Sequence, residues 1–68
     1  LQEANFQRAS LRDVLLDDAY MGNVNLRDAD LRNASLQDAN LQGAKLAGTK
    51  LRGANLKGVY LPDGMRNN

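Results

Sequence analysis

An apolar residue recurs at every fifth position along nearly the whole chain, without one slip in register. These central residues are Leu1, Phe6, Leu11, Leu16, Met21, Leu26, Leu31, Leu36, Leu41, Leu46, Leu51, Leu56 and Leu61. Two positions before each one, from Phe6 onward, stands a small residue: Ala4, Ala9, Val14, Ala19, Val24, Ala29, Ala34, Ala39, Ala44, Thr49, Ala54 or Val59. The remaining positions are mostly polar. The chain is therefore an internal repeat, and its fold must bury one side chain in five together with a small neighbour.

A period of five fits neither a helix nor a flat strand. On an α-helix, five residues rotate the side chain about 140° beyond whole turns, so the leucines would spiral around the axis. On a strand, an odd step sends successive leucines to opposite faces. The central residues all point inward if the chain turns a corner every five residues. Four such sides close a square coil of twenty residues, and the 68-residue chain is long enough for about three coils.

Residues suited to tight turns occupy the expected corners. The second residue after each central residue is mostly Asn, Asp or Gly, which tolerate a positive φ. The last coil has glycine at every corner, which predicts type II turns at Gly43, Gly48, Gly53 and Gly58. Pro62 stands where its fixed φ suits a turn. In this coil Thr49 is the only polar residue at a small inward position, and we expect its hydroxyl to bond a backbone carbonyl.

The motif A-[ND]-L, seen in Ala29-Asp30-Leu31, Ala39-Asn40-Leu41 and Ala54-Asn55-Leu56, resembles the pentapeptide-repeat family. The resemblance implies an all-β fold, a right-handed quadrilateral parallel β-helix over residues 1–63. It also implies a family abundant in cyanobacteria and present in other bacteria and plants. Residues 64–68 are expected to form a C-terminal tail, in which Met65 is a candidate cap. Because Leu1 is already in register, we expect this chain to be a segment of a longer one.

The amino-acid composition argues against a catalytic or metal-binding role for this chain. It contains no cysteine and no histidine, which excludes disulfides, Cys/His zinc sites and imidazole catalysis. Packed leucine and alanine leave no pocket for a small substrate, so we expect no enzyme, cofactor or metal site. The apolar runs are too short to span a membrane. The absence of cysteine suits any compartment; a soluble, cytoplasmic protein is favoured, with the thylakoid lumen or the periplasm as alternatives.

Charged residues are unevenly distributed along the chain. Residues 1–44 carry a net charge of −3 and residues 45–68 a net charge of +4, for a total of +1. Arg12, Arg32 and Arg52 are twenty residues apart and should form a vertical ladder, with Lys50 beside the last of them. Like charges at strand spacing repel, so the ladder is either compensated, with Asp13 and Asp30 available, or paired with an anionic partner.

Other exposed residues are weaker candidates for contact. Leu15, Tyr20 and Tyr60 are predicted to face outward, either as ordinary exposed apolar residues or as an interaction patch. Asp17, Asp18 and Asp38 should cluster on one face, where a solvated surface is favoured over a cation site because the chain lacks a loop with ligand spacing.

These observations favour a non-catalytic structural or protein–protein interaction module with an unidentified protein partner. Exposed coil edges also allow end-to-end self-association. One alternative, implied by the family, is a DNA-mimicking protein that binds topoisomerase (gyrase) and confers quinolone resistance, but such a mimic is a long acidic rod. Another is a spacer appended to a larger enzyme or signalling protein. Nucleic-acid binding through the arginines is disfavoured because no aromatic platform accompanies them.

Overall fold

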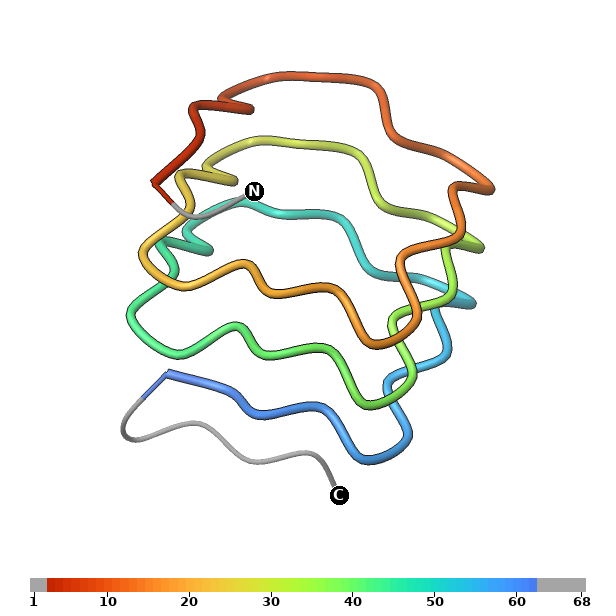
Figure 1. Ribbon diagram of the computed structural model, residues 1–68. Helices are drawn as coiled ribbons and strands as arrows, with labels where there is room; N and C mark the ends of the chain where they lie inside the picture. The colour runs from red at the N-terminus through yellow and green to blue at the C-terminus, as the bar shows by residue number, and fades with distance from the viewer. Residues whose placement is uncertain (1–2, 63–68) are drawn as a thin grey trace.

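The computed structural model describes residues 3–62, which wind into three stacked coils of twenty residues each (Figure 1). We call residues 3–22, 23–42 and 43–62 the first, second and third coils. A residue with positive φ occurs at every fifth position from Glu3 to Gly58. In the corner after Leu41, for example, Gly43 has a φ of 78° and the N–H of Ala44 donates to the Leu41 carbonyl at 3.0 Å. This geometry is that of a type II turn, which confirms the prediction for that corner.

Neighbouring coils are joined by parallel β-bridges between residues twenty positions apart. Each side of a coil carries a single bridge, such as Ser10 to Asp30 and then Asp30 to Lys50. Within residues 3–62 there is no helix and no continuous strand, because a corner interrupts the backbone before a strand can extend. The predicted stacking of four-sided coils is therefore present, but its β-structure consists of isolated bridges.

The side around Leu31 illustrates how the backbone is satisfied. The Leu31 N–H donates forward to the Lys50 carbonyl at 2.8 Å, and the Asp30 N–H donates backward to the Ala9 carbonyl at 2.9 Å. The N–H of Arg32 has no backbone acceptor and instead donates to the Asp30 Oδ1 at 3.1 Å. The same local bond runs from Gln7 to Asn5, Arg27 to Asn25, Gln42 to Asn40 and Lys57 to Asn55. This bond explains why the A-[ND]-L motif has Asn or Asp at its second position, since both side chains supply the oxygen that accepts it.

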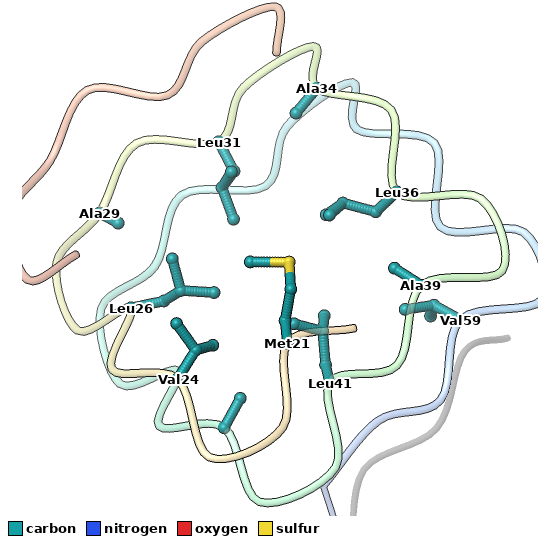
Figure 2. Packing of buried hydrophobic residues seen from close by; sticks show 11 residues of the cluster. Met21, Val24, Leu26, Ala29, Leu31, Ala34, Leu36, Ala39, Leu41 and Val59 are labelled. Atoms are coloured by element: carbon teal, nitrogen blue, oxygen red, sulfur yellow. The ribbon is translucent and has the colours of Figure 1, made fainter. Parts of the chain in front are cut away.

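The interior is a single column of apolar side chains (Figure 2). Figure 2 shows leucines and small residues from the four sides pointing inward around Met21. The largest fully buried side chains are those of Met21, Val24, Leu26, Leu31, Leu36 and Leu41. Central residues of the outer coils, such as Leu11 and Leu51, are only partly buried. The second coil is therefore the best-packed part of the core, because it has a neighbour on each side.

Corners in the third coil show why glycine occupies them. A Cβ built on Gly48 would lie 2.2 Å from the Oδ1 of Asp28, the corner residue of the coil before. The other three glycine corners, Gly43, Gly53 and Gly58, have the same relation to Asn23, Asn33 and Asp38. Glycine therefore permits the positive φ and also leaves room for the Asn or Asp side chain of the preceding coil.

Thr49 behaves as expected, because its Oγ1 donates to the Leu26 carbonyl at 2.7 Å. Across the part of the chain that the structure describes, no helix has the length and apolar character needed to cross a membrane. The expected tail and the Met65 cap lie outside the described residues. End-to-end association through the coil edges stays a prediction.

Candidate functional site

The three arginines of the predicted ladder occupy equivalent places in successive coils. Arg12, Arg32 and Arg52 each follow the central leucine of one side and open the next corner. The Ser10–Asp30 and Asp30–Lys50 bridges fix the twenty-residue register of this side. We call these arginines the arginine ladder, and the ladder together with Lys50 the basic strip.

The middle rung of the ladder is paired within the protein. Arg32 donates from Nε to the Asp30 Oδ1 at 2.9 Å and from Nη2 to Oδ2 at 2.7 Å. This two-pronged contact is the one ion pair among residues 3–62. The side-chain hydrogen bond from Arg32 lowers the pKa of Asp30 from 3.8 to about 2, and the charge of Arg12 acts in the same direction. Asp30 raises the pKa of Arg32 in return.

The outer rungs of the ladder are Arg12 and Arg52. Within residues 3–62, neither Arg12 nor Arg52 makes an ion pair, and both are exposed. Asp13, which the sequence offered as a compensating neighbour, forms no ion pair with Arg12. Within the described coils an ion pair therefore forms at Arg32 alone, although the Asp30 charge also attracts Arg12, and the strip keeps an excess of positive charge.

Around the third coil the positive charge is least balanced. Every charged residue between positions 43 and 62 is basic, namely Lys45, Lys50, Arg52 and Lys57. A shallow, open hollow lies on the ladder side, lined by Arg32, Lys50, Leu51 and Arg52. Sequence reasoning found its three cations but not Leu51, because only the partial burial of the end coil brings this core residue to the surface. The hollow can accept an anionic group, and it is not an enclosed substrate pocket.

The exposed apolar candidates do not join the ladder. Leu15 is 79% exposed, Tyr20 58% and Tyr60 60%. Tyr20 and Tyr60 bridge to Asn40 on the side that precedes Met21, Leu41 and Leu61, which lies across the coil from the side of Leu31 (Figure 2). Leu15 lies on the side that follows the ladder corner and bridges to Ser35. The four basic residues thus lie on the ladder side, Leu15 on the neighbouring side and the two tyrosines on the opposite side.

The acidic cluster has a partly structural role. Asp17 accepts hydrogen bonds from the Ser35 hydroxyl and, at 3.0 Å, from the Gln37 N–H. On other sides, the Asn or Asp two positions earlier accepts this backbone N–H. Position 35 is a serine, so Asp17 of the coil before accepts the Gln37 N–H instead. Among residues 3–62, no group of three acidic side chains is arranged to hold a metal ion.

The fold and surface define a class: a short solenoid with a filled apolar interior, polar outer walls and one basic strip. The sequence profile of the family described as Pentapeptide repeats matches residues 1–33 and 19–58, with eight copies of the repeat. The chain belongs to the pentapeptide-repeat family. Members of this family are generally structural or interaction proteins.

Two solved structures place the chain among cyanobacterial relatives. It is similar to HetL, a pentapeptide repeat protein involved in heterocyst differentiation regulation from Nostoc sp. strain PCC 7120, with a TM-score of 0.74 and 35% identity over 98% of this chain. It is also similar to Rfr23 from Cyanothece 51142, with a TM-score of 0.54 and 33% identity over 90% of this chain. The chain spans 34% of HetL and 46% of Rfr23. Among curated protein sequences, none is similar enough to count as a match.

Proposed function

We propose that this chain is a non-catalytic protein-binding module and that its binding surface is the basic strip. The observation that carries this proposal is the unequal pairing of the ladder: Arg32 is held by Asp30, while Arg12 and Arg52 are exposed and form no ion pair among residues 3–62. Charge left unpaired on a regular, rigid wall is suited to a complementary surface, since such charge steers association and sets specificity.

The arrangement of the interior supports the absence of catalysis. Leucine, methionine, valine and alanine side chains fill the space between the four sides, and the hollow on the basic strip is open to solvent. A reaction site needs groups held in a place from which water can be excluded, and the outer walls offer none within residues 3–62. The similarity to HetL, which is involved in regulating differentiation, is compatible with a role in binding. It also supports the finer proposal that the coils form the right-handed quadrilateral β-helix of the family.

Two alternatives fit less well. A DNA-mimicking topoisomerase inhibitor would present a strongly acidic rod, whereas this chain has a net charge of +1 and a third coil with only basic charges. A passive spacer would explain the solenoid but gives no reason for a strip on which Arg12 and Arg52 form no ion pair among residues 3–62. Tyr20 and Tyr60 are left out of the proposed surface because they lie on the opposite side of the coil. Leu15 is left out because it lies on the neighbouring side, beyond the ladder corner, and carries no charge.

Affinity capture from a lysate of the source organism tests the proposal. The 68-residue chain is compared with Arg12→Gln/Arg52→Gln, which keeps the Arg32–Asp30 pair, and with Lys45→Gln/Lys57→Gln, which removes the same charge elsewhere. We expect a protein that the wild type and the lysine variant retain and the arginine variant releases, with release also by added salt. Equal capture by all three, or no capture, would count against the basic strip as a binding surface.

A further inference from the structure

We propose that the partner of the basic strip is an acidic α-helix lying parallel to the solenoid axis, with its carboxylates on one face. This inference rests on the proposed function, because it names the chemistry and shape of the molecule that the strip binds. Three features support it: the spacing of the rungs, the pairing of Arg32, and the charge of the next corner.

Rung spacing favours a helix over an extended segment. Stacked coils bring equivalent residues to about 4.8 Å from one another, so Arg12 and Arg52 are about 10 Å apart along the axis. Residues at i and i+4 of a helix are about 5–6 Å apart, and those at i and i+7 about 10.5 Å. The spacing of carboxylates at i, i+4 and i+7 therefore matches the spacing of the three arginines along the axis. Residues on the same face of a strand are about 6.6–6.8 Å apart, so the third such residue lies well beyond the third arginine.

Because the middle arginine is already paired, the partner helix is bound mainly by the outer arginines. Arg32 keeps its carboxylate from Asp30, and its side chain is 39% exposed. The outer arginines and Lys50, which form no ion pair within residues 3–62, can bind carboxylates at the two ends of a helical stripe. A helix with acidic residues at i and i+7, and an acidic or polar residue at i+4 between them, satisfies this arrangement. Arginine suits such contacts because its guanidinium binds a carboxylate through two parallel bonds.

The corner beyond the ladder limits which anionic partner fits. Asp17, Asp18 and Asp38 occupy the next corner along the chain, where they repel negative charge. A partner with acidic residues all around its surface would meet this cluster. One with a single acidic stripe avoids it. Nucleic acid carries phosphates along its whole surface, and the two exposed tyrosines lie across the coil, so neither its charge nor its bases suit this strip.

A titration with designed peptides followed by NMR tests the helix proposal. The probe is an alanine-rich, end-capped peptide with glutamates at i, i+4 and i+7, and the observed signals are the backbone amides and the arginine Nε–H groups. One control peptide has the same composition with the glutamates on three different faces, and a second keeps the spacing but carries a central proline that breaks the helix. A short duplex DNA is the third probe. All are measured at low ionic strength, where charge pairing is strongest.

We expect the one-faced peptide to bind about tenfold more tightly than either control peptide, with the largest shifts at Arg12, Arg52 and Lys50. Arg12→Gln/Arg52→Gln should lose about tenfold in affinity, whereas Lys45→Gln/Lys57→Gln should lose much less. Arg12→Lys/Arg52→Lys keeps the charge and should fall in between. The circular dichroism spectrum of each variant verifies that the coils remain folded.

Different failures have different meanings. Equal binding of all three peptides would overturn the helix and leave the basic strip as an unspecific anionic surface. Tighter binding of the DNA duplex than of the one-faced peptide would replace the helix by nucleic acid. If a captured protein depends on the ladder but the one-faced peptide gains nothing over its controls, the proposed function survives and the helical partner does not.

Discussion

The side chain of Asp30 makes two kinds of hydrogen bond at once. Its Oδ1 accepts from the Arg32 N–H, as the Asn residues at this motif position do on their own sides, and its carboxylate also pairs with the Arg32 guanidinium. Asn at this position would keep the first role and could accept from the Arg32 Nε, as Asn25 does from Arg27 at 3.2 Å, but it would lose the ion pair with the guanidinium. Asn25 stands at the same spacing before Arg27, so an arginine two positions later does not by itself require Asp. At position 30, Asp rather than Asn neutralises the middle rung of the ladder.

The pair predicts a stability that depends on pH in the acid range. Because the pKa of Asp30 is lowered from 3.8 to about 2, its ionised form stabilises the fold above pH about 4, and this contribution is lost as the pH falls toward 2. Asp30→Asn should be less stable than the wild type at neutral pH, with a difference that shrinks between pH 4 and 2. Urea unfolding at a series of pH values measures it. Arg32→Gln should lose the same pH-dependent part, and parallel curves for wild type and Asp30→Asn would contradict the role of the pair.

At the corners of the third coil, the Asn or Asp side chain of the coil before lies close to the corner residue. The first and second coils place non-glycine residues at positive φ, including Arg8 at 63° and Asp28 at 60°. In the third coil every corner is glycine, and each lies under an Asn or Asp of the second coil. A side chain added at a third-coil corner would therefore meet the Asn or Asp of the second coil.

Gly48→Ala tests this contact. Alanine at a φ of 75° is strained, and its Cβ would meet the Asp28 Oδ1, so we expect a loss of about 1–2 kcal/mol in the free energy of unfolding. Adding Asp28→Gly removes the facing side chain and should recover part of the loss. A double-mutant cycle measured by urea unfolding separates the two effects. Purely additive changes would show that backbone strain alone accounts for the glycine.

In the molecule as a whole, burial depends on having a coil above and below. Leu31 in the second coil is fully buried, whereas Leu11 in the first coil, at the equivalent position, is only partly buried. Neighbour contacts of this kind dominate the stability of solenoids. With three coils, one coil supplies most of the fully buried core, and the fold is sensitive to any cavity made there.

Leu31→Ala should therefore destabilise the protein much more than Leu11→Ala. For Leu31 we expect a loss of about 2–5 kcal/mol, a large share of the free energy of unfolding that a small domain possesses. The partly exposed Leu11 should lose less, because its methyl groups already contact water. Chemical unfolding of both variants provides the comparison. Equal losses would mean that the described coils share one uniform core.

The architecture of this protein could be predicted from its amino-acid sequence alone. A period of five, with a small residue two places before each apolar one, leaves four-sided coils as the way to bury every leucine, and Thr49 and the Gly43 turn behave as the pattern predicts. Local chemistry was enough because each repeat of five meets the same constraint. Residues twenty apart were also placed correctly, since the register follows from counting.

Which of these side chains form ion pairs and hydrogen bonds with one another could be seen only in the tertiary structure. Asp13 and Asp30 were equal candidates to neutralise the ladder, and the structure pairs Asp30 with Arg32 and leaves Arg12 and Arg52 without an ion pair among the described residues. Nor does the pattern show that Asp17 accepts hydrogen bonds from Ser35 and Gln37 in the next coil, or that the Asp28 side chain occupies the space beside Gly48. These choices depend on side-chain reach and direction between coils, which a one-dimensional spacing does not contain.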